Sequence, residues 1–221
     1  MGVMNTRFDD VADDLRTAYA GGAEHRDAIA KTPWKLAERA AFLDRLRSAG
    51  ARTLVEIGAG TGQDALFFQQ SGLDVIATDL TAEMVAACAA KGLDARVMSV
   101  LAPDLPAESF DAAYALNCLL HVPDADLPAA LASVRSLLRP DGLFFLGLYG
   151  GDGSEGVVEW DRHDPPRFFS WRTDAQLLAA AGEHFDVVDF HRVPLDPEGW
   201  FQSLTLSRRR GRGGRPRSRG A

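Results

Sequence analysis

The chain is poor in cysteine and lacks long apolar runs. Its two cysteines, Cys88 and Cys118, are too few for a disulfide framework, and their apolar surroundings indicate buried free thiols in a reducing compartment. No apolar stretch approaches the roughly 18 residues needed to span a bilayer, and the start MGVMNTRFDD lacks the apolar segment of a secretory signal. We therefore expect a cytoplasmic protein that does not enter a membrane.

Acidic residues are missing from the last 14 residues, RRRGRGGRPRSRGA, which contain seven arginines. The other 207 residues carry 17 basic and 31 acidic side chains, a net charge of −14. A body of that charge repels phosphate backbones, so nucleic acid is an expected partner only through the arginines. Because Gly, Pro, Ser and Arg cannot build a core, residues 208–221 are predicted to form a disordered tail.

What the sequence does contain is a regular alternation of apolar runs and helical patterns from residue 53 onward, typical of a parallel sheet wrapped by helices. Strands are expected at 53–57, 74–78, 94–98, 110–116, 143–149, 185–190 and 201–206, and helices at about 62–71, 81–91, 125–138 and 173–183. Only PLDPEG separates the last two strands, which is too short for a crossover helix, so they should pair antiparallel. We predict a Rossmann-like three-layer α/β sandwich whose seven-stranded, mostly parallel sheet has its last strand antiparallel.

Residues 6–49 have a helical pattern, with a face at helical spacing formed by Leu36, Ala40, Leu43, Leu46 and Arg47. In open α/β sheets, ligands bind beyond the carboxyl ends of the strands. We expect this segment and the stretch 149–172 to fold over that edge. The chain is therefore divided into an N-terminal helical cap (1–50), a ligand-binding domain (51–207) and the tail (208–221).

The segment LVEIGAGTGQDA is an apolar strand that carries an acid and opens into three glycines on alternate positions. Without a Cβ, Gly58, Gly60 and Gly62 let the backbone approach a ligand, and the following helix directs its positive end at the same point. Either a pyrophosphate or an amino-acid carboxylate fits there. A dinucleotide fingerprint needs its third glycine at position 63, which is Gln63. Glu56 hinders a pyrophosphate but suits an ammonium group, which favours S-adenosylmethionine (SAM).

A second acid, Asp79, closes the next apolar run, LDVIATD. A carboxylate at the end of the second strand can accept hydrogen bonds from both ribose hydroxyls. Since NAD and SAM share that ribose, Asp79 indicates an adenosine cofactor without choosing between them. Leu80 follows it, where it can pack on the adenine.

Four segments, VEIGAGTGQDA, VIATDL, SFDAAYALNCLLHVP and LLRPDGLFFLGLYG, resemble motifs of the class I SAM-dependent methyltransferases over about residues 50–150. The resemblance implies an enzyme that uses SAM as its cofactor. It also implies the residues that bind SAM: Glu56, Gly58, Ala59, Gly60 and Gly62 at the methionine end, Asp79 at the ribose, Leu80, Ser99 and Val100 near the adenine, and Asn117 near the transferable methyl. Members of the family often carry an acid where this chain has Ser99, which bonds adenine more weakly.

Two histidines are candidate catalytic bases. His121 lies one turn after Asn117 and can reach a substrate, but it can equally cap helix carbonyls or contact the cofactor. His163 lies in EWDRHDPPRFFSW, where Asp residues on both sides suggest a metal site. The two prolines that follow are typical of a loop, so we expect no metal there and prefer a substrate contact. The nearby aromatics form either a lid over the substrate or part of the core: Trp160, Phe168, Phe169 and Trp171.

Small size and an acidic body favour a small-molecule methyl acceptor, methylated on O or N. The Asn-Pro-Pro-Tyr type of motif typical of amino-targeting nucleic-acid methyltransferases is missing, because Asn117 is followed by Cys-Leu-Leu. Two alternatives stay open: an NAD(P)-dependent oxidoreductase, and a non-catalytic module of the same fold that binds RNA through the arginine tail.

Overall fold

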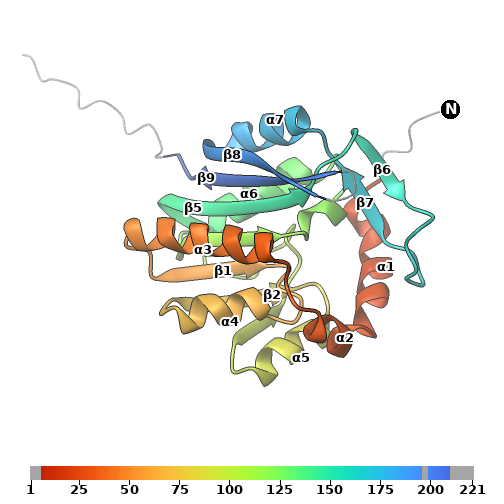
Figure 1. Cartoon of the computed structure of the whole chain (residues 1–221), viewed down its shortest axis with the longest axis horizontal. Helices are drawn as coiled ribbons and strands as arrows, with labels where there is room; N and C mark the ends of the chain where they lie inside the picture. The colour runs from red at the N-terminus through yellow and green to blue at the C-terminus, as the bar shows by residue number, and fades with distance from the viewer. Residues whose placement is uncertain (1–5, 196–198, 210–221) are drawn as a thin grey trace, which may run out of the picture.

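A seven-stranded sheet forms the middle layer of the computed structural model, which describes residues 6–195 and 199–209 (Figure 1). Its strands follow the order β3-β2-β1-β4-β5-β9-β8. They are β1 (Thr53–Ile57), β2 (Asp74–Asp79), β3 (Asp94–Val97), β4 (Phe110–Leu116), β5 (Leu138–Tyr149), β8 (Asp186–Pro194) and β9 (Trp200–Ser207). The last strand, β9, pairs antiparallel with both β5 and β8, whereas the other strands run in one direction. The predicted sandwich and its antiparallel last strand are confirmed.

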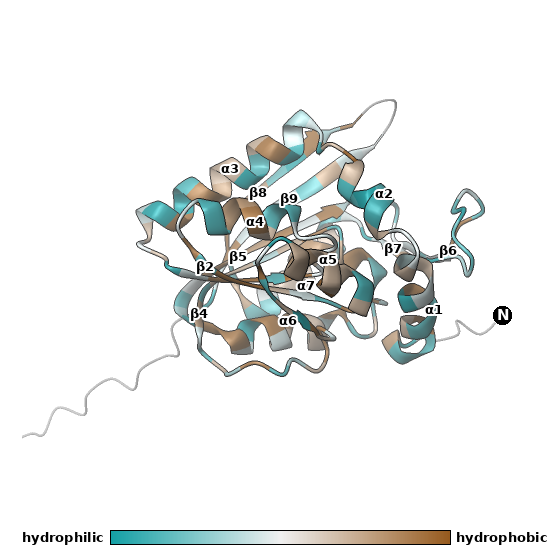
Figure 2. Ribbon diagram, turned by 90° about the horizontal axis from the view of Figure 1, so that it is seen from below, coloured by the Kyte–Doolittle hydropathy of each residue, from teal (hydrophilic) through white to brown (hydrophobic). Residues whose placement is uncertain are grey.

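Helices cover both faces of the sheet, with apolar residues turned inward and polar residues outward (Figure 2). One face is covered by α3 (Pro33–Ser48), α4 (Gln63–Gln70) and α5 (Ala82–Ala90), and the other by α6 (Leu127–Leu137) and α7 (Asp174–His184). The elements α1 (Phe8–Ala20) and α2 (Ala23–Ala28) lie at the same end of the molecule as a two-stranded ribbon, β6 (Ser154–Val157) with β7 (Phe168–Trp171) (Figure 1). Within the described ranges, no helix is both long and apolar enough to cross a membrane.

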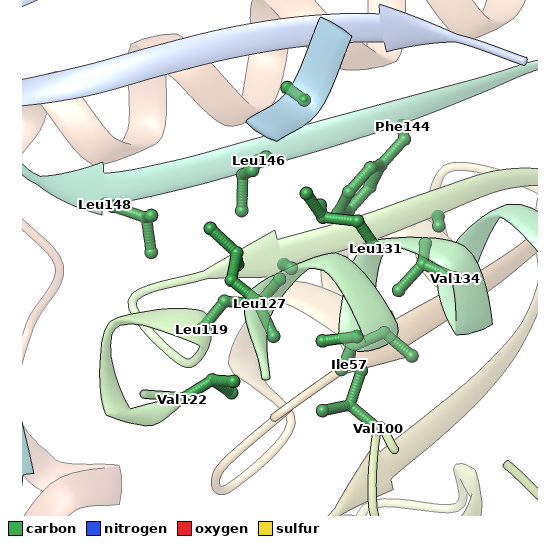
Figure 3. Close-up of a cluster of buried hydrophobic side chains, with 14 of the residues drawn as sticks. Ile57, Val100, Leu119, Val122, Leu127, Leu131, Val134, Phe144, Leu146 and Leu148 are labelled. Carbon is green, nitrogen blue, oxygen red and sulfur yellow. The ribbon is translucent and has the colours of Figure 1, made fainter. Parts of the chain in front are cut away.

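Helix α6 shows how the sequence builds the core (Figure 3). Leu127, Leu131 and Val134 recur at helical spacing, and none is more than 3% exposed. They belong to the same buried cluster as Phe144 and Leu146 of β5. Full burial of each such side chain stabilises the fold by about 1.5–3 kcal/mol. This packing fixes the ends of β4 and β5, from which part of the site is built.

The N-terminal segment is helical as predicted, but its buried face differs from the expected one. Leu36 and Ala40 are exposed, whereas Phe42 packs with Leu43 and Leu46. The face is rotated because the ring of Phe42 enters an aromatic group on the sheet, with its centroid 5.9 Å from that of Tyr114. A large ring stabilises more by burial than a leucine at the edge of the helix.

Two segments differ in detail from their predicted outlines. The stretch 149–172 forms the β6–β7 ribbon, which the sequence did not announce because SEGV is short and has no apolar alternation. At the start of the predicted tail, Arg208 forms an ion pair with Glu108, and Arg209 forms one with Asp186. The rest of that tail lies outside the described residues.

Candidate active site

A cavity of about 510 Å³ opens at the carboxyl ends of β1, β2 and β4. Its walls also include residues of α1, α2 and α3, the short 3₁₀ helix η1 (Leu119–His121), and β7. Ligands of open α/β sheets bind at this edge. The N-terminal helices and the ribbon therefore complete a pocket that the sheet begins.

Three left-handed glycines form the turn between β1 and α4. Gly58 has φ +65°, Gly60 φ +55° and Gly62 φ +80°. A Cβ on Gly58 would lie 2.3 Å from that of Cys118, and one on Gly62 would lie 2.8 Å from the sulfur of Cys88. A Cβ on Gly60 would meet no protein atom within 4 Å, and Gly60 lines the cavity. Gly58 and Gly62 thus permit close packing of the turn, while Gly60 leaves space for a ligand.

Gly62 is not part of the cavity wall, although the sequence placed it at the methionine end of SAM. It is the N-cap of α4 and lies against Leu93 and Cys88 on the side of α5. Glycine patterns show where a backbone bends but not which bend faces the ligand. Gly58, Gly60 and the intervening Ala59 do line the cavity.

Glu56 is 3% exposed and lines the cavity, and its Oε2 atom has no hydrogen-bond partner. Burial raises the pKa of this carboxyl well above its usual range, and the nearby charge of Asp64 raises it further. Lys31 opposes the shift. A buried acceptor atom without a donor is costly, so this site favours a cationic ligand group.

Asp64, which the sequence did not single out, anchors the N-terminal segment beside the glycine turn. Its carboxylate lies 2.8 Å from Nζ of Lys31 and 2.8 Å from Nη1 of Arg39. Gln63 donates from Nε2 to the carbonyl oxygen of Asp27 at 2.9 Å. These contacts hold the loop between α2 and α3 against the start of α4, next to the cavity.

Asp79, at the end of β2, lies directly beside the glycine turn. Its Oδ2 accepts the N–H of Gly60 at 2.9 Å, and its Oδ1 accepts the N–H and hydroxyl of Thr81 at 3.0 and 2.9 Å. Asp79 also lines the cavity, where its carboxylate can accept a hydrogen bond from a ligand hydroxyl. Burial raises the pKa of Asp79, against the effect of these donors. Leu80 also lines the cavity.

After β3, the cavity wall is apolar. Met98 and Val100 line it, whereas Ser99 does not. The hydroxyl of Ser99 accepts the N–H of Leu101 at 3.3 Å and is engaged in its own turn. The expected Ser99 contact with adenine therefore has no support in the geometry, because residues 98 and 100 occupy the side of the chain that faces the cavity.

Asn117 directly follows β4 and lies in the left-handed region, with φ +54°. Its backbone N–H donates to the carbonyl of Gly147 at 2.8 Å, while its buried Oδ1 has no partner. Asn adopts this backbone region more readily than most residues. The side chain lines the cavity and offers a free acceptor to a ligand.

His121 is 7% exposed, lines the cavity and has both ring nitrogens engaged. Nδ1 is 2.6 Å from the carbonyl oxygen of Phe168, and Nε2 is 2.5 Å from the hydroxyl of Tyr19. Because a carbonyl only accepts, Nδ1 carries the proton, and Nε2 accepts from Tyr19. Burial lowers the pKa of His121 to about 4, with Arg167 and Arg26 acting in the same direction. The ring is therefore neutral and already occupied at neutral pH.

His163 is not part of the cavity wall. Its Nδ1 lies 2.7 Å from Asp161, which also binds Nε and Nη2 of Arg167 at 3.0 Å each. Burial on its own would raise the pKa of Asp161, but the donors of Arg167 and His163 hold it well below its usual range. Arg167 in turn donates from Nη1 to the Tyr19 hydroxyl at 3.0 Å. His163 thus helps to position Asp161 and Arg167 rather than reaching the cavity.

Trp160, Phe169 and Trp171 line the cavity, whereas Phe168 does not. Alternate residues of a strand point to opposite faces, so Phe169 and Trp171 share one side of β7. Their rings are stacked, with centroids 5.2 Å apart and planes 14° apart. Part of the predicted aromatic group therefore faces a ligand, and Phe168 packs into the core.

Sequence reasoning missed most of the polar residues that the N-terminal helices bring to the cavity: Tyr19, Arg26, Lys31 and Lys35. They have no motif spacing relative to the glycine turn, so no local signal could have found them. Among the described residues, no group of three or more His, Cys, Asp or Glu side chains could hold a metal ion.

The site fits SAM on observations of its own. The unpartnered Oε2 of Glu56 suits an α-ammonium group, and the open space at Gly60 admits a ligand close to the backbone. The Asp79 carboxylate lines the cavity, where a ribose hydroxyl can reach it. The apolar wall at Met98 and Val100 suits an adenine ring.

Comparison with known proteins agrees with this geometry. A family model described as a methyltransferase domain matches residues 54–142. None of the curated proteins searched matches the chain.

Two solved structures with S-adenosylhomocysteine (SAH) resemble nearly the whole chain. A Burkholderia thailandensis 1,6-didemethyltoxoflavin-N1-methyltransferase is 24% identical, with 95% of this chain and 94% of that chain covered and a TM-score of 0.73. The DhpI–SAH complex is 25% identical, with 90% and 97% covered and a TM-score of 0.66.

The methyltransferase match covers the glycine turn, Asp79 and Asn117, all of which contribute to the cavity wall. It favours a methyltransferase over a nicotinamide-dependent oxidoreductase and over a non-catalytic module. Residues 54–142 are therefore a methyltransferase domain, and the chain is an enzyme that uses SAM as its cofactor.

Proposed function

We propose that this enzyme transfers the methyl group of SAM to an O or N atom of a small molecule. The observation that carries the proposal is a cavity of about 510 Å³, whose wall joins the glycine turn to Tyr19, His121 and the aromatic residues of the ribbon. That volume lies in the usual range for small-molecule sites. The strongly acidic body argues against a nucleic-acid substrate.

In this proposal, the cofactor side of the cavity consists of Glu56, Gly60, Asp79 and Asn117. Glu56 would hold the α-ammonium group of SAM, and Asp79 a ribose hydroxyl. Asn117 would lie near the transferable methyl, as its position at the end of β4 supports. We further propose that α1 and α2 act as a cap, because Tyr19 and Arg26 contribute to the same cavity wall.

When bound, SAM supplies a methyl group on a sulfonium, and the protein aligns the acceptor and excludes water. His121 is not a free resting base, since its Nε2 accepts the Tyr19 hydroxyl and burial lowers its pKa to about 4. Its role in the proposal is to position Tyr19 on the acceptor side. This arrangement suits an acceptor that is already deprotonated or is a neutral amine.

A similar protein supports the small-molecule class. The Burkholderia thailandensis enzyme was solved with 1,6-didemethyltoxoflavin bound and is named as an N1-methyltransferase. The likeness covers 95% of this chain and 94% of that chain.

The test is incubation with methyl-labelled SAM and an extract divided into small-molecule, protein and nucleic-acid fractions. We expect label to enter the small-molecule fraction and to stay out of the other two. An Asp79→Ala variant should abolish labelling through loss of SAM binding, while Asp13→Ala, an exposed acid on α1, should not. Label found only in protein or nucleic acid would overturn the proposal.

A further inference from the structure

The acceptor side of the cavity carries a positive charge that no carboxylate of the described residues neutralises. Of the four cations in the cavity wall, Lys31 pairs with Asp64 and Arg167 with Asp161. Lys35 donates to the Tyr149 hydroxyl at 3.3 Å and forms no ion pair with a described residue. Arg26 has no ion pair within the part of the chain that the structure describes. Its guanidinium lies over the ring of Tyr19, 4.3 Å from the centroid.

A second guanidinium, that of Arg167, also contacts Tyr19. Arg167 lies 5.4 Å from the centroid of the Tyr19 ring and donates to the Tyr19 hydroxyl. Both Arg26 and Arg167 oppose the effect of burial on the pKa of Tyr19, and both lower that of His121. The corner formed by Tyr19 and His121 is therefore electropositive, although both of these side chains are themselves uncharged.

Next to this corner is a wall of aromatic side chains. Trp160 is 57% exposed although it is a large apolar side chain, and its ring centroid lies 5.5 Å from that of Phe169. Phe169 is stacked on Trp171 and lies 4.8 Å from the ring of His121. Aromatic rings pack favourably in offset stacks, so a planar ligand ring would extend this wall and cover Trp160.

We propose that the methyl acceptor is an aromatic acid, whose ring lies against Trp160 and Trp171 and whose anionic oxygen is bound by Arg26 beside Tyr19. A planar guanidinium matches the geometry of a carboxylate or a similar oxyanion, and it holds its charge throughout the physiological pH range. The inference rests on the proposed small-molecule function and adds the charge and shape of the substrate.

The first test is calorimetry on the full chain saturated with SAH, using 2-naphthoate and its uncharged counterpart 2-naphthamide as probes. We expect naphthoate to bind at least tenfold more tightly than naphthamide. Arg26→Gln should remove this preference, while Arg16→Gln, an arginine of α1 paired with Asp13, should leave it intact. Trp160→Ala should weaken both probes to a similar degree.

Several results would overturn the inference. If the two probes bind with equal affinity, or if neither binds, the protein has no preference for an aromatic acid. A tenfold loss of SAH affinity in Arg26→Gln would show that this arginine serves the cofactor instead.

The second test separates the inference from the proposed function. A small-molecule extract is passed over an anion-exchange resin, and each fraction is assayed for label from methyl-labelled SAM. We expect the acceptor in the retained fraction. Acceptor activity only in the flow-through would overturn the inference that the acceptor is an acid, but it would leave the proposed small-molecule methylation intact. Label only in macromolecules would overturn both the inference and the proposed function.

Discussion

Substitution of two turn glycines, Gly60 and Gly62, by alanine separates the effect of backbone packing from that of ligand access. At φ +55°, an alanine at Gly60 costs about 1–2 kcal/mol of backbone strain, and its Cβ would meet no protein atom within 4 Å. Gly50, at φ +68° and away from the cavity, has the same open surroundings and serves as the matched control. Gly62→Ala adds contacts at 2.7 and 2.8 Å, an overpacking cost of about 1–3 kcal/mol more.

The expected result is that Gly60→Ala and Gly50→Ala unfold at similar temperatures, about 2–8 °C below the wild type. Gly62→Ala should unfold at a lower temperature than either. In calorimetry, Gly60→Ala should bind SAH at least tenfold more weakly, a loss of about 1.4 kcal/mol, while Gly50→Ala should bind like the wild type.

One outcome would refute the reasoning: a folded Gly60→Ala variant that binds SAH with unchanged affinity. The open space at this glycine would then not be used by the cofactor. A large loss of stability in Gly60→Ala without a comparable loss in Gly50→Ala would also contradict it, because the two sites have equivalent protein surroundings.

Three further substitutions test two residues of the site and one buried residue that supports it. Burial raises the pKa of Glu56, so the ligand-free protein should lose stability as the pH rises above the pKa that this carboxyl has in the unfolded chain. In urea unfolding, Glu56→Gln should remove this loss. The same substitution should weaken SAH binding about ten- to hundredfold. Burial lowers the pKa of His121 to about 4. The neutral ring therefore contributes about 3 kcal/mol to the free energy of unfolding above pH 6.5, and this contribution should be lost as the pH falls towards 4. In His121→Gln, the free energy of unfolding should depend less on pH over this range. Arg172 is buried and donates to the carbonyls of Leu119 and Val122; Arg172→Met should cost about 2–4 kcal/mol in chemical unfolding, and a cost below 0.5 kcal/mol would contradict this.

The strands and helices could be predicted because their signals are local. The strand Phe110–Leu116 has the predicted bounds, and the cap of α7 at Thr173 follows from its own sequence, where Gln176 completes a capping box. The glycine turn, with Glu56 and Asp79 around it, was found for the same reason, since its residues act on a neighbouring backbone.

The acceptor side shows where local signals end. Tyr19 meets His121 across 102 residues of sequence, and it meets Arg167 across 148. Which side chain of α1 faces the cavity depends on how that helix docks, and the docking depends on packing partners spread through the chain. The sequence also named His163 and Ser99 as site residues, but it could not show that one holds Asp161 and the other closes its own turn.

By itself, the sequence determined the layered fold, the glycine turn and the class of cofactor, because periodicity, glycine geometry and strand-end acids act over a few residues. Only the tertiary structure decided which glycine leaves space for a ligand, that His121 is neutral and occupied, and that Arg26 is left without a carboxylate. These properties arise from burial and from contacts between distant segments, which exist only after the chain has folded.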